Sequence, residues 1–404
     1  RMASLLEENV FFMWLSGMSR PDFRTINRFR SERLADGRFE SIFRQVVELL
    51  HEEGLVSLDV QYIDGTKIES VANKYTFVWK GSVEKNKAKL IAKVDGVLKA
   101  AEAVLEEENA DEPQEEITKE DLQKRTDRIL EKMDEEGVSD KKLRKAVSKI
   151  KEESLPKLDE YDKHLEILGE RNSYSKTDPD ATFMHMKEDA MNNGQTKPGY
   201  NVQIATENQY IVNYDLYWRP TDYGTLIPFL ESFHDKFGFY SSEIVADSGY
   251  GSEQNYEFMF ANGMTPYVKY NMFHKEMKRK FLKNPFHQAN MFYNQEQDFY
   301  VCPMGQHMEH VTDKKIVSDL GYVSHTSVYK AANCSGCPLR GMCYNGKGDR
   351  RTIEVNHRAN SFKSSAKALL TSDRGLMHRS KRPIEPESCF GNIKFNHGFK
   401  RFHL

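Results

Sequence analysis

The order of the strands and helices that the sequence predicts restricts this chain to a mixed α/β sheet. A first strand is expected over residues 55–68, where apolar and polar residues alternate, and two more over 199–205 and 210–214. The pattern then predicts a helix over 225–237, a strand over 243–247, a helix over 253–262 and a strand over 265–270. Strands separated by helices form a sheet with helices on its faces, so the fold class is α/β.

The remaining segments complete the predicted organisation. Three short helices are expected near the N-terminus, over residues 3–18, 23–34 and 39–53, and a last helix begins near Pro386. The predicted parts, in order, are an N-terminal helical subdomain (1–54), the first part of the core (55–81), a charged helical insert (82–175), the second part of the core (176–285), a Cys-rich insert (286–355) and a C-terminal helix region (356–404).

Two of these parts leave alternatives open. The second helix is basic on one side, which suits a DNA-binding module, but a plain helical subdomain has the same pattern. The charged insert, with a loop expected near Asp111-Glu112-Pro113, is either an arm for a partner helix or an insertion that lies on its own domain.

The charge is divided unevenly along the chain, although the net charge of −3 is close to neutral. Residues 81–170 hold 25 Asp+Glu and 18 Lys+Arg, a net of −7, which leaves a net of +4 for the rest. Residues 361–404 carry nine basic and three acidic residues. Because local basic patches decide nucleic-acid binding, the near-neutral sum does not exclude a nucleic-acid partner.

Composition excludes other classes of protein. The chain has no run of about 18 apolar residues, so we expect no membrane span. The first residues, Arg1-Met2-Ala3-Ser4, show no signal-peptide pattern, so we expect no secretion. Five cysteines in 404 residues do not make a disulfide framework, and their clustering points to a metal site.

Three carboxylates are the candidates for catalytic chemistry. Asp64 and Asp247 each follow an apolar strand segment and precede a glycine, at the edge where α/β sheets place their ligands. Glu387 lies in the first turn of the last predicted helix, and Lys394 follows on the same face. Paired hard oxygen ligands suit Mg²⁺ or Mn²⁺. Strand-end Asp residues also cap turns, and a Glu at a helix start also complements the helix dipole.

The cysteines form the strongest local motif. Cys334 and Cys337 make a C-x-x-C pair, and Cys302 and Cys343 lie on either side of it. Four thiolates suit a structural Zn²⁺ site, with buried unliganded thiols as the alternative. Cys389 is left over and is expected in a helix core.

Taken together, these segments resemble a bacterial insertion-sequence transposase of the DDE type, in the subgroup with a cysteine-bearing insert before the catalytic glutamate. The resemblance covers nearly the whole chain. The segments that carry it are Arg20-Pro21-Asp22-Phe23-Arg24-Thr25, Tyr62-Ile63-Asp64-Gly65-Thr66-Lys67-Ile68-Glu69, Lys197-Pro198-Gly199-Tyr200-Asn201-Val202-Gln203-Ile204-Ala205, Ala246-Asp247-Ser248-Gly249-Tyr250-Gly251, and Glu387 with Phe390-Gly391-Asn392-Ile393-Lys394.

The resemblance implies a ribonuclease H-like core in which Asp64, Asp247 and Glu387 bind two Mg²⁺ (or Mn²⁺) ions that serve DNA cleavage and strand transfer. The family's Tyr-x2-Arg-x3-Glu-x6-Lys motif is half present, because positions 380 and 383 are Ser and Pro. Arg379 or Arg382 is expected to replace its arginine.

The resemblance also implies DNA as the partner, both the terminal inverted repeats and the target. It further implies a homodimer on paired ends, no membrane, and a cytoplasmic location at the bacterial nucleoid. The basic and aromatic tail suits phosphate contact and base stacking. The expected DNA-binding residues are Lys67, Lys74, Arg379, Arg382, Lys394, Lys400 and Arg401. The alternative function is a catalytically silent DNA-binding protein that keeps the same fold.

Overall fold

The computed structural model describes residues 2–105, 118–135, 141–186, 194–346 and 348–403. The chain divides into two compact units, one of residues 1–64, 203–215 and 223–392 and one of residues 65–202, 216–222 and 393–404. The loop predicted at residues 111–113 lies outside the described residues. No helix within the described residues has the length and apolar character that a membrane span requires.

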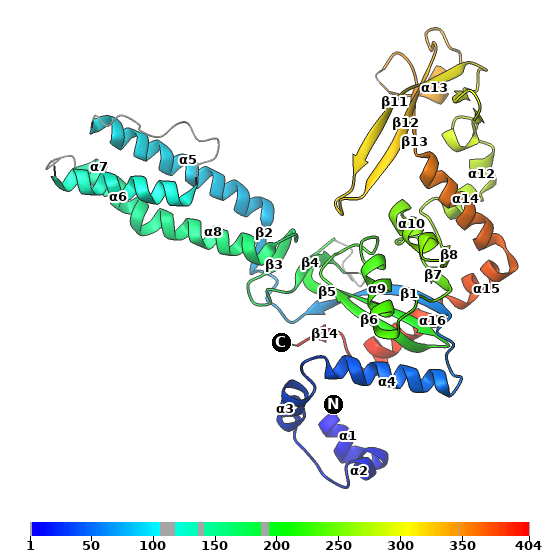
Figure 1. Cartoon of the computed structure of the whole chain (residues 1–404), viewed down its shortest axis with the longest axis horizontal. Coiled ribbons are helices and arrows are strands. Elements are labelled where there is room, and N and C mark those ends of the chain that lie inside the picture. The colour runs from blue at the N-terminus through cyan, green and yellow to red at the C-terminus, as the bar shows by residue number, and fades with distance from the viewer. Residues whose placement is uncertain (1, 106–117, 136–140, 187–193, 347, 404) are drawn as a thin grey trace. The chain divides into compact units, whose positions relative to one another are not determined.

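The largest sheet found among the described residues is mixed, as predicted. Its strand order is β4-β5-β1-β7-β8, with β6 beside β5 and β14 beside β1 (Figure 1). β1, β7 and β8 are parallel, whereas β4 and β5 are antiparallel. The strands are β1 (Val60–Ser70), β4 (Thr182–His185), β5 (Thr196–Glu207), β6 (Tyr210–Tyr217), β7 (Glu243–Ala246), β8 (Thr265–Val268) and β14 (Arg401–Phe402).

The turn between β5 and β6 differs by two residues from the predicted one. Asn208 and Gln209 both have positive φ, 51° and 65°, which is the geometry of a two-residue hairpin turn that follows the twist of its strands. The first of the two strands was predicted to end at residue 205, but β5 continues to Glu207. The Glu207 carboxylate accepts hydrogen bonds from the backbone N–H groups of Ser57 (2.9 Å) and Leu58 (2.7 Å), just before β1.

Helices pack on the parallel strands of the first unit. α9 (Leu226–Phe237) buries one apolar face, with Phe229 and Phe233 fully covered. α10 (Glu253–Ala261) begins at Ser252, whose hydroxyl accepts a hydrogen bond from the Asn255 N–H. α9, α10, β7 and β8 lie within two residues of their predicted bounds, whereas β1 begins five residues later than predicted, at Val60. The mixed sheet with helices confirms the α/β class.

The helices of the C-terminal region were not predicted, apart from the last one. They are α14 (His357–Thr371), α15 (Asp373–Lys381) and α16 (Glu385–Gly391). Ser372 ends α14 and also caps α15, since its hydroxyl accepts a hydrogen bond from the Gly375 N–H. An added Cβ at Gly375 would lie 2.0 Å from the Leu369 carbonyl oxygen, so the close approach of the two helices requires glycine there.

The N-terminal helices differ from the sequence prediction at one point. The single helix expected over residues 3–18 is two helices, α1 (Met2–Glu8) and α2 (Val10–Leu15). The break lies at Asn9, whose side chain accepts hydrogen bonds from the N–H groups of Phe11 and Phe12 and so begins a new helix. α3 (Phe23–Arg33) and α4 (Arg38–Glu52) match the expectation, with Asp22 as the N-cap of α3.

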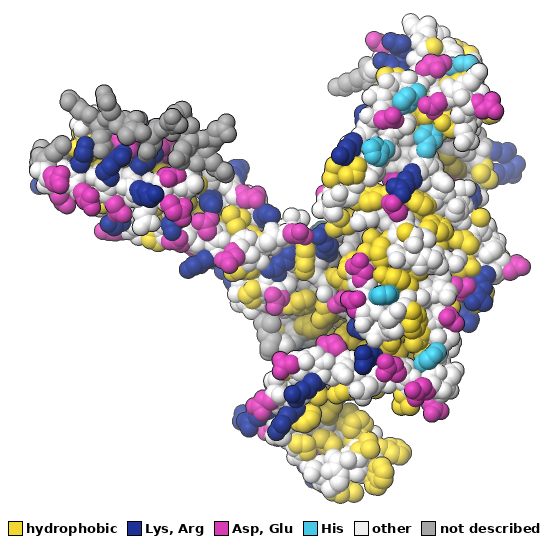
Figure 2. All heavy atoms as spheres, in the orientation of Figure 1, with side chains coloured by type: hydrophobic (Ala, Val, Ile, Leu, Met, Phe, Trp, Pro, Cys, Tyr) yellow, Lys and Arg dark blue, Asp and Glu magenta, His cyan; other side chains and the backbone are white. Residues whose placement is uncertain are grey.

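The charged insert is a bundle with its own hydrophobic core, not a simple two-helix hairpin. Its helices are α5 (Lys80–Val104), α6 (Lys119–Glu135), α7 (Lys141–Lys149), a π-helical turn (Ile150–Ser154) and α8 (Leu155–Leu168). Its core includes Leu98, Leu122, Ile129 and Leu158, each fully buried. Charged side chains of both signs cover its visible surface (Figure 2). In the same unit, β2 (Phe77–Trp79) pairs with β3 (Ser173–Ser175).

The cysteine-bearing segment forms a second sheet of the first unit. Its strand order is β13-β12-β11-β10-β9. The strands are β9 (Phe292–Asn294), β10 (Phe299–Val301), β11 (His307–Val317), β12 (Val323–Ala331) and β13 (Thr352–Val355). Three short helices accompany it: α11 (Phe273–Glu276), α12 (Arg279–Leu282) and α13 (Arg340–Cys343).

Candidate active site

Asp64 and Asp247 lie at the same level of two neighbouring parallel strands. β1 and β7 pair Tyr62 with Val245, so two residues further on the register brings Asp64 beside Asp247. Asp247 directly follows β7, as predicted, and its Oδ1 accepts a hydrogen bond from the Gly249 N–H (2.7 Å). Asp64 does not end its strand, because β1 continues to Ser70. It is 8% exposed, so the sheet fixes it firmly.

The guanidinium of Arg382 lies between the three candidate carboxylates. Its Nη2 is 3.2 Å from Oδ1 of Asp64 and 3.7 Å from Oδ2 of Asp247, and its Nη1 is 4.0 Å from Oε1 of Glu387. The side chains of Arg382 and Asp64 are each 11% exposed. Breaking such a buried pair by removing one partner typically costs about 3–5 kcal/mol. The contact to Glu387, whose side chain is 58% exposed, contributes far less.

Glu387 and its neighbour Glu385 have different environments, although both lie in the first turn of α16. Glu385 is 5% exposed, and its Oε2 accepts a hydrogen bond from the Gln209 N–H (2.8 Å). It therefore anchors the helix to the β5–β6 turn. Glu387 faces Arg382 and solvent. Of the two, Glu387 is thus the one that lies near the guanidinium shared with the aspartates.

These carboxylates fit a divalent cation in chemistry, but they do not surround an ion in the present geometry. Within the described residues, no three His, Cys, Asp or Glu side chains are arranged to hold a metal ion. The three carboxylates contact a guanidinium instead, and the buried Nε of Arg382 has no hydrogen-bond partner. Carboxylate oxygens are the ligands that Mg²⁺ and Mn²⁺ prefer, so such an ion could bind here once Arg382 has moved.

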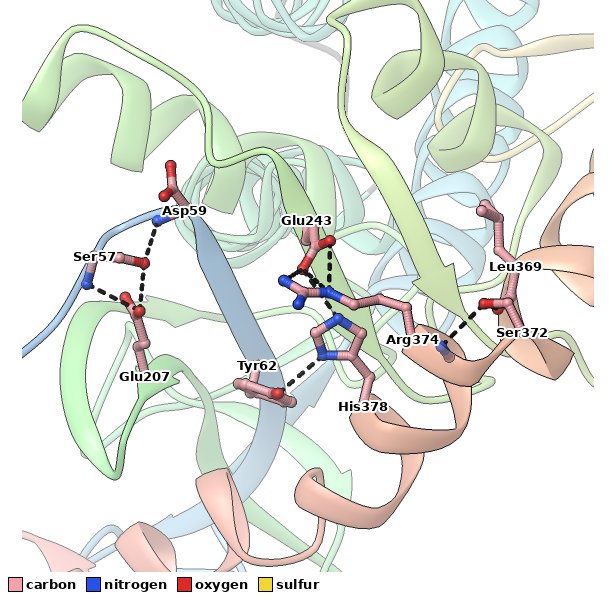
Figure 3. Close-up of polar contacts among 10 residues, drawn as sticks. Ser57, Asp59, Tyr62, Glu207, Glu243, Leu369, Ser372, Arg374 and His378 are labelled. Atoms are coloured by element: carbon pink, nitrogen blue, oxygen red, sulfur yellow. Dashed lines mark hydrogen bonds and ion pairs between the residues drawn. The ribbon is translucent and has the colours of Figure 1, made fainter.

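A buried histidine connects α15, whose C-cap is Arg382, to strands β1 and β7. His378 is 1% exposed; its Nδ1 lies 2.9 Å from the Tyr62 hydroxyl and its Nε2 lies 3.0 Å from Glu243 Oε2 (Figure 3). Arg374 binds the same carboxylate through Nε and Nη2. Burial lowers the pKa of His378 more than the Glu243 carboxylate raises it. We call Tyr62, Glu243, Arg374 and His378 the histidine latch.

Lys269 is a site residue that the sequence analysis missed. It directly follows β8, at the same sheet edge as Asp247. Its pKa is lowered mainly by burial, and the nearby positive charges of Arg382 and Arg379 lower it further. The signal was available, because a helix separates the strand predicted over 265–270 from the strand predicted over 243–247, and two strands connected in this way lie parallel in one sheet. Gly251 shapes this edge, since an added Cβ would lie 2.2 Å from the Lys269 carbonyl oxygen.

Four of the predicted DNA-binding residues line one pocket of the second unit. The pocket measures about 180 Å³, and its lining includes Lys67, Lys394, Lys400 and Arg401. Lys197, which was not predicted as a DNA-binding residue, completes the basic lining. The Glu69 carboxylate lies 3.2 Å from both Lys197 Nζ and Arg401 Nε. We call this the basic pocket.

The other predicted DNA-binding residues lie elsewhere. Arg379 stacks over the Phe273 ring at 5.2 Å from its centroid. Lys74 is exposed and lies over the Tyr75 ring at 5.1 Å. Arg382 faces the three carboxylates, so in this conformation it is bound to acidic groups and not open to a phosphate.

All four predicted zinc-binding cysteines line one small cavity of about 20 Å³. They are free thiols, and they are not grouped as metal ligands in the described residues. Arg351 lies beside them: its Nη1 is 2.9 Å from Cys343 Sγ, and its backbone N–H donates to Cys334 Sγ (3.4 Å). A cavity of this size holds one water-sized group. Cys389 is buried on α16, as predicted, and its Sγ donates to the Gln209 carbonyl.

The fold and the site define a mixed α/β protein in which three carboxylates surround the guanidinium of Arg382. Residues 301–404 match the family described as the transposase DDE domain. The match confirms the resemblance to DDE transposases. It includes Glu387 and Lys394 but not Asp64 or Asp247, and it does not test the subgroup with the cysteine-bearing insert. Neither the curated proteins nor the solved structures gave a significant match.

We predict that the histidine latch makes stability depend on pH. Because the pKa of His378 is lowered in the folded state, the latch contributes fully above the ordinary value of 6.5 and is lost as pH falls below it. His378→Gln should therefore unfold more readily at pH 7.5 and lose less further stability at pH 5.5 than the parent. Urea unfolding at both pH values measures this.

Tyr62→Phe is the control: it removes one hydrogen bond, worth about 1 kcal/mol, and keeps the titrating His378 ring. Equal pH slopes in parent and His378→Gln would contradict the assignment.

Proposed function

We propose that this chain is a DNA transposase that cuts and joins DNA phosphodiesters at the ends of a mobile element. Asp64, Asp247 and Glu387 would be its metal-binding carboxylates. The observation that carries the proposal is the convergence of all three on one guanidinium. The ribonuclease H-like character of the core is part of the same proposal, supported by the parallel β1-β7-β8 arrangement and the family match.

The three carboxylates would have different tasks. Asp64 is a rigid ligand, because it is buried within a paired strand. Asp247 lies in a turn held by the Gly249 N–H, and Glu387 is exposed enough to change its rotamer. Divalent ions bound here would lower the pKa of the attacking water and stabilise the leaving oxygen. Lys269 lies at the sheet edge of Asp247 and within electrostatic reach of Arg379, and basic side chains at this edge favour the approach of a phosphodiester.

The two-metal assignment predicts that Asp247→Ala abolishes Mg²⁺-dependent cleavage. Loss of a residue that only supports a metal ligand typically costs about 10–100-fold in activity, so loss of the ligand itself should cost at least about 100-fold. The substrate is a DNA fragment that carries the inverted repeats flanking the gene, and strand nicking is measured on a gel. Asp373→Asn, at the exposed start of α15, is the control and should cleave like the parent.

Full activity in Asp247→Ala would refute the assignment. The same assay tests the alternative, a catalytically silent DNA-binding protein, which the neutralisation of the carboxylates by Arg382 favours. Salt-dependent binding of the fragment by the parent, with no cleavage at any Mg²⁺ or Mn²⁺ concentration, would establish that alternative.

The basic pocket would hold a phosphate of the DNA backbone. Five basic side chains and one carboxylate line it, so it carries excess positive charge, and its volume admits a phosphate group. We predict that Lys400→Gln weakens DNA binding about equally for all sequences and reduces the salt slope by about one. Binding is measured by fluorescence anisotropy across a salt series. Lys149→Gln, at an exposed position of the helical insert, removes the same charge and should leave the slope unchanged.

The cavity lined by the four cysteines would hold a structural Zn²⁺ ion. Thiolates are the preferred ligands of such sites, and the four thiols come from separate parts of the Cys-rich insert, which one ion would tie together. Metal analysis of the purified protein should find about one Zn per chain, lost in Cys334→Ser. Cys389→Ser is the control, because Cys389 bonds to Gln209 and does not line this cavity. Absence of zinc from the parent would refute the site.

We propose a homodimer that acts on paired element ends and on a target DNA. Its place would be the bacterial cytoplasm, at the nucleoid.

A further inference from the structure

Helix α4 has an apolar stripe along its surface, and the rest of its unit covers only part of the width of this stripe. Val47, at 1% exposure, and the half-buried Phe43 form the covered part, and the Phe43 ring packs edge-on against Tyr214 with centroids 4.8 Å apart. The helix is therefore held firmly on one side. The neighbouring side of the same stripe stays open, although α1, α2 and α3 precede it in the chain.

The open side consists of four large apolar residues. Phe39, Ile42, Val46 and Leu49 are exposed by 51%, 47%, 49% and 54%, and the Phe39 ring also lies edge-on to Tyr214 with centroids 6.4 Å apart. Their spacing of three, four and three residues is that of a coiled-coil seam, whose side chains interlock with those of a facing helix. Figure 2 shows hydrophobic side chains gathered around these N-terminal helices. A contiguous exposed apolar face of this kind marks an interaction surface.

We propose that a second copy of this chain covers the open face, with the two α4 helices antiparallel about a two-fold axis. Phe39 then faces Leu49 of the partner subunit, and Ile42 faces Val46 of the partner subunit. By symmetry each contact occurs twice. The proposal supplies an interface for the dimer proposed above, and it depends on the transposase assignment only for that dimer's role at paired DNA ends.

The charges beside the seam select the second copy and its direction. Arg38 flanks the seam at the start of α4 and Glu52 flanks it at the end, and both are exposed. An antiparallel pair brings Arg38 next to Glu52 of the partner subunit at both ends, whereas a parallel pair would place both beside the opposite flank of the partner helix, which carries the apolar Phe43 and Leu50. Arg44 and Glu48 bind each other within the helix (3.5 Å) and lie outside the seam. The apolar seam itself offers no partner for phosphates, which disfavours DNA as the occupant.

Charge reversal in the full chain, without DNA, tests this arrangement by analytical ultracentrifugation. The parent should form a dimer of the 46.9 kDa chain in a concentration-dependent manner. Arg38→Glu and Glu52→Arg each place like charges at both ends of the seam and should raise the dimer dissociation constant about tenfold or more, a cost of about 1.4 kcal/mol. The double variant Arg38→Glu/Glu52→Arg restores opposite charges and should restore the parent value. Glu48→Arg, on the same helix outside the seam, is the matched control.

A cross-link tests the axis. Gln45 lies midway between Arg38 and Glu52 on the same flank, so a two-fold axis brings it close to Gln45 of the partner subunit. Gln45→Cys with a short bismaleimide should give a covalent dimer in higher yield than the parent or Glu48→Cys.

A parent that stays monomeric at all concentrations, with α4 covered by its own α1–α3 helices, would overturn the proposal. A dimer that none of the charge variants weakens, or that the double variant fails to restore, would also overturn it. A protein that dimerises as predicted but cuts no DNA would leave this interface standing and refute only the transposase assignment.

Discussion

The contact between one guanidinium and three carboxylates is the interaction on which the site depends. Asp64 is 8% exposed, and burying a carboxylate is costly unless an opposite charge pairs with it; Arg382 provides that charge at 3.2 Å. The same contacts bring Asp247 and Glu387, which are far apart in sequence, to within reach of a common point. A divalent cation at that point would satisfy the same oxygens with twice the charge. In the proposed site, Arg382 and the metal would therefore be alternatives.

The position of Arg382 follows from the packing of α15. The histidine latch ties this helix to β1 and β7, the strands that lead to Asp64 and Asp247. Gly375 lets the start of α15 approach the end of α14, and Glu385 ties the next helix to the β5–β6 turn. All of these contacts lie within one unit of the chain. The distance between Arg382 and the aspartates is thus fixed by buried hydrogen bonds and not by the surface loops.

The sequence predicted those features of the fold that depend on a local pattern of residues. Alternation and turn residues located β5, β6, β7 and β8, and the three carboxylates were found from the residues around them. The break at Asn9 was missed because a side-chain cap interrupts an otherwise continuous apolar run. α14 and α15 were missed because their packing depends on distant strands. The role of Arg382 required the fold, since nothing in residues 379–394 indicates which charged group reaches Asp64. Lys269 could have been found from its place after a parallel strand.

The most direct test of the central claim is a crystal structure with Mn²⁺, in which anomalous scattering locates the ion. We predict a peak between Asp64, Asp247 and Glu387, with the Arg382 guanidinium displaced from its contacts to all three. Arg382 unmoved between the carboxylates at saturating Mn²⁺, or a peak bound only elsewhere, would contradict it.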